Sequence, residues 1–208
     1  KVRLPDADPN TFLPFLVTGL WPWVAFSEGL LRGMGAIVER SALISKVAMP
    51  RSALVLAPVL ASFALNGVGF VAVLLVIAAF GYPVDLGGIA QAVPYWILLA
   101  AFAFGLALAL STLRVFVPDA AHVVPQLTSL WFYLTPIFYP ISIIPARLRD
   151  AVEANPMTAY TSLFRHALVG EPVALLPTLG VALGGAVLAL LVGGYMFRRA
   201  ARHFEDFL

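Results

Sequence analysis

Residues 52–80 read SALVLAPVLASFALNGVGFVAVLLVIAAF and carry no charged side chain. As one helix this stretch would be about 43 Å long, which exceeds the hydrocarbon thickness of a bilayer. We expect it to tilt, to kink at Pro58 or to project beyond the membrane. A charge-free segment of this length is typical of a membrane-spanning helix, so the chain is built for a lipid environment.

The composition of the whole chain supports the same conclusion. Of its 208 residues, 61% are hydrophobic and 12% are charged, and the mean hydropathy is +0.93. Soluble domains average about 25% charged residues. A formal net charge of +2 does not indicate a nucleic-acid partner, and the absence of cysteine excludes disulfides and thiolate metal sites. The length allows about five or six spans, so we predict a single membrane domain over residues 1–208.

Five apolar runs alternate with polar connections, which predicts an all-α membrane protein with five transmembrane helices. The runs cover about residues 12–31, 52–80, 92–113, 123–139 and 172–197. Most basic residues follow the first, third and fifth runs, and the positive-inside rule places them, with the carboxyl end, in the cytoplasm. The amino end then lies outside without a signal pattern. We therefore expect a preceding sixth span that this sequence lacks.

Prolines interrupt the end of the fourth run, in the stretch YLTPIFYPISIIP at residues 133–145. A proline lacks an amide donor and its ring clashes with the preceding helical turn, so the chain must bend there. Residues 141–171 then contain two short helix-compatible segments, separated by an Asn-Pro turn signal. We predict a re-entrant helical hairpin that acts as a gate at the outer mouth of a pathway. An extracellular loop with two surface helices is the alternative. The candidate gate residues are Pro136, Tyr139, Pro140, Pro145, Asn155, Pro156 and Arg165.

Ionisable residues that could couple transport to an ion gradient are nearly absent from the apolar runs. Glu28 is the only acid inside one, and its position four residues before Arg32 favours an interfacial ion pair over a proton site. Asn66 is expected to hydrogen-bond a neighbouring helix. The sequence has no phosphate-binding loop of an ATPase, so we expect the energy to come from a partner.

Residues 37–51, IVERSALISKVAMPR, form the best candidate contact with such a partner. A short helix can begin at Ser41 and end at Pro50, which would give a compact cytoplasmic element with exposed charges. An ordinary positive-inside loop explains the same charges. The candidate coupling residues are Glu39, Arg40, Lys46, Pro50 and Arg51.

Aromatic side chains are dense in the first and fourth runs. Flat amphipathic rings that line a channel could stack on sugars and offer polar groups without fixed charge, whereas the alternative is packing in an interfacial belt. The candidate path residues are Trp21, Trp23, Phe26, Trp131, Phe132 and Tyr133. Arg165 is a candidate contact for a phosphate or pyrophosphate linkage, with a snorkelling interfacial arginine as the alternative.

Two further patterns concern packing and catalysis. Gly29 with Gly33, and Gly180 with Gly184, have a spacing that lets helices approach closely, so the last run is expected to pack tightly within or between protomers. No catalytic residue and no metal site is predicted from the histidine spacing. An intramembrane enzyme remains a minor alternative. Its candidate residues would be Asp119, His122 and Asn155.

Several stretches together resemble a known family. They are GLWPWVAFSEGL at residues 19–30, LISKVAMPR at 43–51, residues 136–172 around the hairpin, and FRRAARHFEDFL at 197–208. In order and spacing they resemble the permease subunits of ATP-binding-cassette (ABC) exporters for O-antigen, capsular polysaccharide and teichoic acid.

The resemblance implies a six-span permease of the bacterial cytoplasmic membrane that pairs with a second protomer and with two ATPase subunits. ATP and Mg would bind on the ATPase subunits, with no cofactor on this chain. The coupling segment and the gate of re-entrant helices are also features of that family. A lipid-linked or long glycan is the implied cargo, and a drug or small lipid is the alternative.

Overall fold

The computed structural model describes residues 9–41, 50–201 and 204. Within these residues it contains seven α-helices, one short 3-10 helix and no strand, which confirms the predicted all-α class. The helices are α1 (Pro9–Glu39), α3 (Arg51–Ala79), α4 (Ile89–Phe116), α5 (Ala120–Leu134), η1 (Ile141–Ile143), α6 (Ala146–Glu153), α7 (Pro156–Val169) and α8 (Leu175–Ala200).

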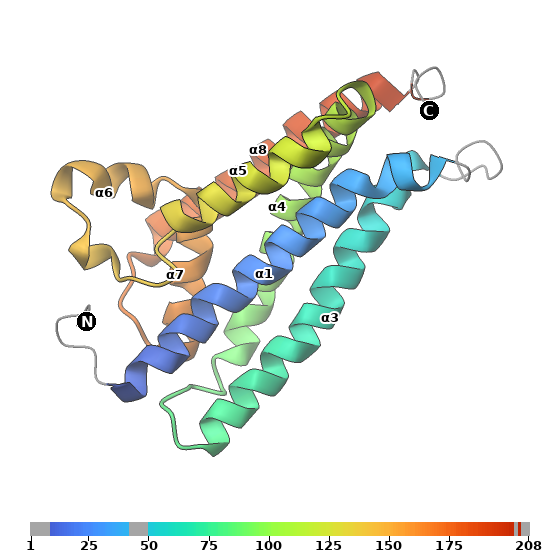
Figure 1. Cartoon of the computed structure of the whole chain (residues 1–208). Helices are drawn as coiled ribbons and strands as arrows, with labels where there is room; N and C mark the ends of the chain where they lie inside the picture. Colours follow the sequence, from blue (N-terminus) through green and yellow to red (C-terminus); the bar gives the residue numbers. More distant parts are fainter. Residues whose placement is uncertain (1–8, 42–49, 202–203, 205–208) are drawn as a thin grey trace.

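The long helices run alongside one another, so that the molecule has two distinct ends (Figure 1). One end carries the end of α1, the start of α3, the turn between α4 and α5, and the end of α8. We call it the basic end, because it holds Arg40, Arg51, Arg114, Arg198 and Arg199. The opposite end carries the start of α1, the α3–α4 connection and the segment from η1 to α7. We call it the hairpin end.

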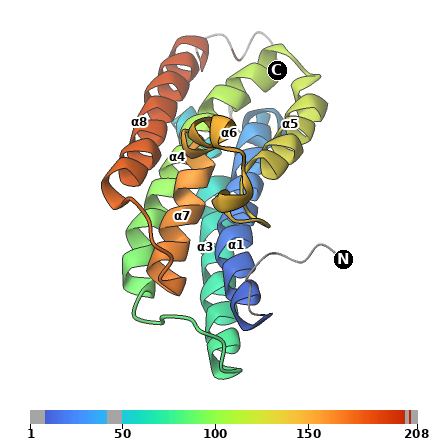
Figure 2. The ribbon, with the colours of Figure 1, turned by 90° about the vertical axis from the view of Figure 1, so that its left-hand side faces the viewer.

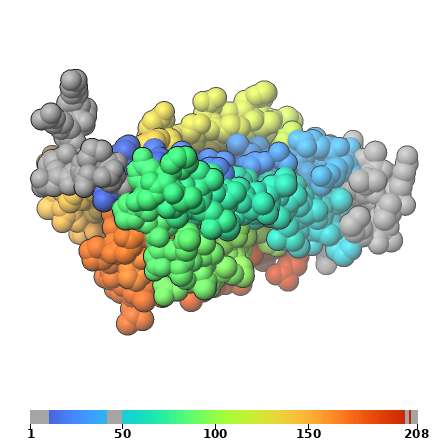
Figure 3. All heavy atoms as spheres, turned by 90° about the horizontal axis from the view of Figure 1, so that it is seen from below, coloured from blue at the N-terminus to red at the C-terminus, as the bar shows by residue number. Residues whose placement is uncertain are grey.

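Three of the described helices, α3, α4 and α8, are long and apolar enough to cross a membrane. Figure 3 views the molecule from the side on which α3 and α4 lie. On α3 the side chains of Leu65, Val68 and Val76 are exposed, which suits contact with lipid. These three helices match the predicted runs 52–80, 92–113 and 172–197.

The other two predicted runs differ from the helices that form. Helix α1 is long, but its prolines, tryptophans and Glu28 lower its average hydropathy. Helix α5 has 15 residues, fewer than the roughly 20 that span a bilayer without help from a neighbour. The predicted run 123–139 is therefore wrong at its end, because the helix stops at Leu134. Thr135 is extended, with φ −96° and ψ 132°, as expected for the residue before a proline.

The basic end also differs from the prediction at one boundary. Helix α1 continues to Glu39, so the first residues of the predicted coupling segment 37–51 belong to a long helix rather than to a separate element. Residues 42–49, including Lys46, lie outside the described residues. The predicted short helix within them stays a prediction.

Two helices follow the proline-rich stretch, as the sequence predicts, with Asn155 between them. They have opposite environments. Helix α6 contains no buried residue, whereas ten of the 14 residues of α7 are buried. Helix α7 packs against α1, α4 and α8 and lies in the middle of the bundle when the molecule is viewed from the hairpin side (Figure 2). The alternative of two surface helices therefore does not describe α7.

The last helix packs closely against α4 within the protomer. A Cβ atom added to Gly193 would overlap the carbonyl oxygen of Gly105, and one added to Gly105 would overlap the backbone of Ala189. Both positions therefore require glycine. In contrast, a Cβ at Gly180 or Gly184 would meet nothing within 4 Å, so this predicted packing pair has no partner within the described part of the chain.

Candidate functional site

Three prolines of the hairpin lie at the starts of its helices, where they break none of them. Pro140 precedes η1, Pro145 precedes α6, and Pro156 is the first residue of α7. The first amides of a helix have no partner within it, so a missing donor there removes no hydrogen bond. The prolines thus divide one apolar stretch into short elements with fixed boundaries.

Asn155 joins the end of α5 to the start of α7. Its side-chain oxygen accepts hydrogen bonds from the amide of Met157 at 3.1 Å and from the indole of Trp131 at 3.0 Å. Its side-chain amide donates to the hydroxyl of Thr135 at 3.2 Å. Asn155 is therefore both the N-cap of α7 and a bridge to α5.

Arg165 fixes the proline-rich loop against the bundle. Its side chain is 2% exposed, and its guanidinium donates to the carbonyl oxygens of Pro136 at 2.9 Å and Ile137 at 2.8 Å. A longer contact of 3.4 Å reaches the carbonyl of Phe15 in α1, and the guanidinium carbon lies 3.5 Å from the centroid of the Phe15 ring. This arginine is thus buried rather than snorkelling to the surface.

The charge of Arg165 is retained despite its burial. An arginine guanidinium does not lose its proton in proteins, so a positive charge lies within the bundle here. Next to it, the Nδ1 atom of His166 lies 2.9 Å from the carbonyl oxygen of Glu171, which holds the start of the α7–α8 connection near α7.

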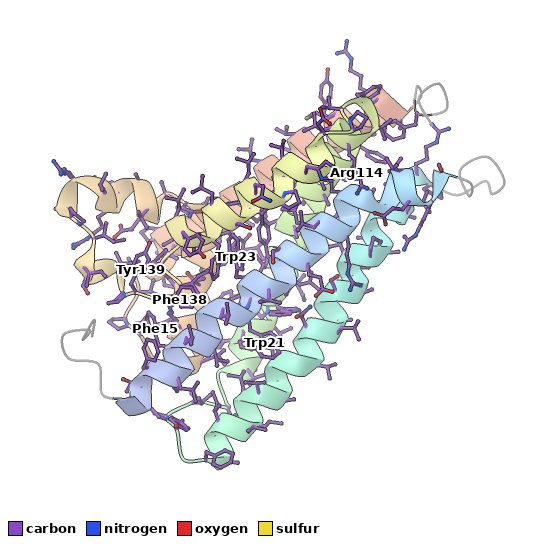
Figure 4. The ribbon with its side chains drawn as sticks, viewed as in Figure 1. Phe15, Trp21, Trp23, Arg114, Phe138 and Tyr139 are labelled. Carbon is purple, nitrogen blue, oxygen red and sulfur yellow. The ribbon has the colours of Figure 1, made fainter. Side chains whose placement is uncertain are left out.

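Tyr160 fixes the other side of α7. Its fully buried side chain donates a hydrogen bond to the carbonyl of Ala182 at 2.9 Å and lies 3.4 Å from that of Leu98. Tyr139 lies at the edge of the hairpin, where its hydroxyl donates to the carbonyl of Tyr133 at 3.2 Å (Figure 4). Helix α7 is thus attached to α1, α4, α5 and α8 by polar contacts as well as by packing.

A cavity of about 670 Å³ opens beside α7, between the hairpin and the start of α8. Its polar lining includes Asp150 and Glu153 from α6, Thr158, Ser162 and Arg165 from α7, and Glu171. Among the described residues no group of His, Cys, Asp or Glu side chains is arranged to hold a metal ion.

The candidate path aromatics divide into separate groups. Trp23 and Phe26 are buried and pack edge-to-face against Trp131, at centroid distances of 6.0 and 5.5 Å. Trp21 lies on another side of α1, toward α3, where its indole donates to the carbonyl of Asn66 at 2.8 Å (Figure 4). Tyr133 is 68% exposed. Phe132 joins the buried group through Trp23 at 5.4 Å, so the six side chains do not share one accessible surface.

The polar residues of the first two helices pair as the sequence predicts. Glu28 forms an ion pair with Arg32 at 2.7 Å, and its other oxygen accepts from the side-chain amide of Asn66 at 2.7 Å. Both predictions, the ion pair and the contact of Asn66 with a neighbouring helix, are confirmed. With its charge paired in this way, Glu28 has the features of a structural residue.

At the basic end, the described coupling residues contact other helices of the bundle. Glu39 forms an ion pair with Arg114 of α4 at 3.3 Å, and Arg40 donates to the carbonyl of Leu54 at 3.2 Å. Arg51 donates to the carbonyl of Ala201, just after α8. Pro50 precedes α3 and is exposed. The ends of α1, α3, α4 and α8 are thereby tied together.

The residues of the enzyme alternative do not meet. Asp119 and His122 lie at the start of α5, at the basic end, whereas Asn155 contacts the opposite end of the same helix. Several contacts that matter here have no signal in the sequence. Phe15, Thr158 and the carbonyls that Arg165 binds are brought together only by folding.

The architecture defines a class of protein: an all-helical, multi-pass membrane protein with polar junctions at its two ends and a buried short helix at one of them. Comparison with known proteins is more specific. The model of the ABC-2 type transporter family matches residues 4–169, and the chain belongs to that family. Its members are membrane components of ABC transporters.

Curated relatives agree with this assignment. The chain is similar to two O-antigen export system permease proteins RfbA from Klebsiella pneumoniae. One is 28% identical over 96% of this chain and 76% of that protein, the other 27% identical over 100% and 78%. A protein of the same name from Myxococcus xanthus is 32% identical over 84% of this chain and 70% of its own length.

Proposed function

We propose that this chain is the permease subunit of an ABC exporter that moves a lipid-linked or long-chain polysaccharide across the bacterial cytoplasmic membrane. The observation that carries the proposal is the similarity to three O-antigen export permeases over at least 84% of the chain. The scarcity of ionisable groups in the apolar helices supports an external energy source, because ion-coupled transporters place such groups at membrane depth.

In this proposal α1, α3, α4, α5 and α8 all cross the membrane, with α1 and the short α5 shielded in part by their neighbours. The basic end faces the cytoplasm, together with the carboxyl end, since cytoplasmic loops are enriched in Lys and Arg. The hairpin then enters the outer half of the membrane. The burial of α7 supports this placement, because broken backbone at membrane depth must be covered by protein or water.

The partners in this scheme are a second permease protomer and two ATPase subunits that bind ATP and Mg. The candidate contact with an ATPase is the segment at the end of α1, with Glu39, Arg40, Lys46, Pro50 and Arg51. Its attachment to α4 through the Glu39–Arg114 pair would transmit a displacement to the bundle.

Helix α1 provides a direct mechanical connection between the two ends. Near its start, the ring and the carbonyl of Phe15 contact Arg165. The helix ends at Glu39, in the coupling segment. A shift of α1 driven by ATP binding would therefore act on the arginine that holds the proline-rich loop. The gate residues from Pro136 to Pro156 would open the outer mouth by this route, and Tyr133, the exposed ring at the end of α5, would contact the passing glycan.

The proposal is tested by reconstituting the permease and its ATPase in vesicles that carry a lipid-linked glycan on one leaflet. We expect a lectin added to the opposite side to bind only after ATP and Mg are supplied. ATP-driven movement of a drug or small lipid without movement of glycan would replace the cargo assigned here. Lectin binding that is independent of ATP would overturn the proposal.

The gate is tested separately by labelling, because these 208 residues contain no cysteine. Single cysteines at Ser142, Ala154 and Thr161 should react differently with a membrane-impermeant maleimide. We expect the first two to react and Thr161, which is fully buried on α7, to remain protected until ATP is added. Full reactivity at all three positions without ATP would contradict a closed gate.

A further inference from the structure

The ion pair of Glu28 and Arg32 lies far from both ends of α1. In α1, α3, α4, α5 and α8, every other described charged residue lies in the first or last turn of its helix. Glu28 is also bonded to Asn66, which lies next to the middle of α3. The pair is therefore the one place in these five helices where described charges lie near the centre of the bundle.

The length of α3 fixes the depth of this pair in the membrane. With 29 residues α3 is about 43 Å long, so a hydrocarbon layer of about 30 Å can shift along it by only about 13 Å. Asn66 lies roughly 20 Å from either end of the helix and stays within the layer for every such shift. Glu28, at 2.7 Å from the Asn66 side-chain amide, shares its depth.

Arg32 is held at a similar depth by Glu28. Side chains on a helix tilt toward its N-terminus, which for α1 means away from the basic end. The guanidinium follows this direction and bonds Glu28 at 2.7 Å, so it does not reach toward the basic end. The two side chains nevertheless remain accessible on the protomer, with exposed fractions of 55% for Arg32 and 31% for Glu28. Among the described residues, Glu28 is the only partner of this guanidinium.

The accessible pair lies on a strip of α1 between α3 and α5, the two helices that flank α1 in Figure 1. On one side Glu28 bonds Asn66 of α3. On the other side Leu31 packs against the cluster that includes Val124 of α5. Neither helix covers Arg32, which extends from the strip between them.

Two possible surroundings of this strip are unfavourable. Charged side chains at membrane depth face protein or water rather than lipid. The middle of α8, in contrast, exposes apolar side chains such as Leu183, Val187 and Leu188, which suit lipid. A dry contact with a second copy is unfavourable as well. In a two-fold pair with its axis along the helices, each charge would meet its own copy at the same depth, so like charges would oppose each other.

We propose that this strip of α1 borders a water-filled passage through the membrane and that Arg32 is a contact for the cargo within it. The pair offers free donors and acceptors without net charge, which suits a neutral chain rich in hydroxyl groups. Glu28, anchored by Asn66, is a positioning residue for Arg32. The inference rests on the proposed export of a glycan and adds the surface of the protomer along which that glycan moves.

The passage is tested with spin labels on the permease, assembled with its ATPase in nanodiscs. Val24→Cys places a label on the strip, at the depth of Asn66, because Trp21 and Glu28 on either side of it both bond Asn66. Val68→Cys is the matched control, since Val68 lies two residues from Asn66 and is 75% exposed on α3.

The relaxation of each label reports its surroundings. At residue 24 we expect collisions with the water-soluble relaxant Ni-EDDA to dominate in at least one of the ATP-free and ATP-bound states. At residue 68 collisions with oxygen, which concentrates in lipid, should dominate in both states. Dominance of oxygen at residue 24 would mean a lipid-facing strip, and few collisions with either relaxant would mean a strip covered by protein. Each of these two results would overturn the passage.

The position of the charges is tested by the rates at which Val24→Cys reacts with an anionic and a cationic methanethiosulfonate. Adding Arg32→Gln leaves Glu28 uncompensated and should lower the anionic-to-cationic rate ratio about threefold or more, whereas Glu28→Gln should raise it by a similar factor. A purely structural effect would change both rates alike. Arg198→Gln, at the exposed end of α8, is the control and should leave the ratio unchanged. An unchanged ratio in the first two variants would overturn the placement of Arg32.

The contact with cargo is tested in the same complex. When the lipid-linked glycan of the lectin experiment and ATP are supplied together, the label at residue 24 should lose most of its collisions with Ni-EDDA. Glycan alone and ATP alone are the controls. Lectin binding without this protection would overturn the route along α1 but would leave the proposed export intact. Absence of lectin binding with a water-accessible strip would count against the export alone.

Discussion

Arg165 is the residue on which the hairpin end depends most directly. A buried charge is unfavourable unless hydrogen bonds compensate for its lost hydration. Here the compensation comes from carbonyl groups of the proline-rich loop and of α1, together with the face of the Phe15 ring. The planar guanidinium suits this task, because its fixed fork of donors can reach two adjacent carbonyls at once.

Arg165→Lys should loosen the loop, because a single ammonium cannot replace the fork. We expect the free energy of unfolding to fall by about 2–4 kcal/mol, since hydrogen bonds to charged groups contribute about 1.5–3 kcal/mol each. In an Ile137→Cys background, where the reporter position is fully buried, maleimide labelling should become faster. Arg147→Lys, an exposed arginine on α6, is the control. Equal labelling rates in both variants would contradict the role given to Arg165.

Asn155→Ala should destabilise the junction of α5 and α7. It removes the N-cap of α7, which contributes about 1 kcal/mol in other helices, and leaves the partly buried indole donor of Trp131 without its acceptor. We expect a total loss of about 2–3 kcal/mol and a shift in tryptophan fluorescence, measured by thermal unfolding in nanodiscs. Gln126→Ala, an exposed amide on α5, should change neither quantity.

At the scale of elements, the contact of α4 with α8 depends on the absence of side chains. Gly105 and Gly193 let the two backbones approach so closely that no Cβ atom fits between them. In a membrane such approach replaces the hydrophobic effect as a source of helix association, because lipid is as apolar as the helix surfaces. The last helix is thereby held within the protomer along part of its length.

Gly193→Ala should therefore separate α8 from α4 and lower the apparent melting temperature of the purified protein. Overpacking of this kind costs about 1–3 kcal/mol or more. Gly184→Ala on the same helix meets open space and should be neutral or stabilising by up to about 1 kcal/mol, because alanine favours helix more than glycine does. If both variants melted at the wild-type temperature, the close contact would not be a determinant of stability.

At the scale of the whole molecule, α1 connects the two ends. Its last turn contacts α4 through Glu39, and its first turns contact Arg165 through Phe15. A rigid helix between the two contacts would transmit a displacement over its full length. In the proposed mechanism, this arrangement would let an ATPase at the basic end influence the gate at the hairpin end.

The double variant Arg40→Glu, Lys46→Glu should weaken association with the ATPase without preventing membrane insertion. Charge reversal changes the attraction to a complementary surface, and contacts of this kind mostly affect association rate and specificity. We expect a loss of at least tenfold in the amount of ATPase that co-purifies, at unchanged permease abundance in the membrane. Arg198→Glu, an exposed basic residue outside the candidate segment, is the matched control. Unchanged co-purification would contradict the coupling segment.

The sequence alone determined the lipid environment of the chain, its all-helical class and the helix boundaries that follow from local chemistry. The charge-free run at residues 52–80 requires a membrane, and the prolines with Asn155 specify where the hairpin helices begin, because these effects act within a few residues. The pairing of Glu28 with Arg32 was also predictable, since positions four apart lie on the same face of a helix.

Only the tertiary structure decided how these elements are used. The sequence of α7 does not reveal that the helix is buried in the bundle, or that Arg165 binds carbonyls from α1 and the loop after α5. The candidate path aromatics likewise separated into a buried cluster, a contact with α3 and an exposed ring. Each of these outcomes depends on residues far apart in the chain. The identity of a single residue does not reveal which main-chain carbonyl it will bind or which helix face it will meet.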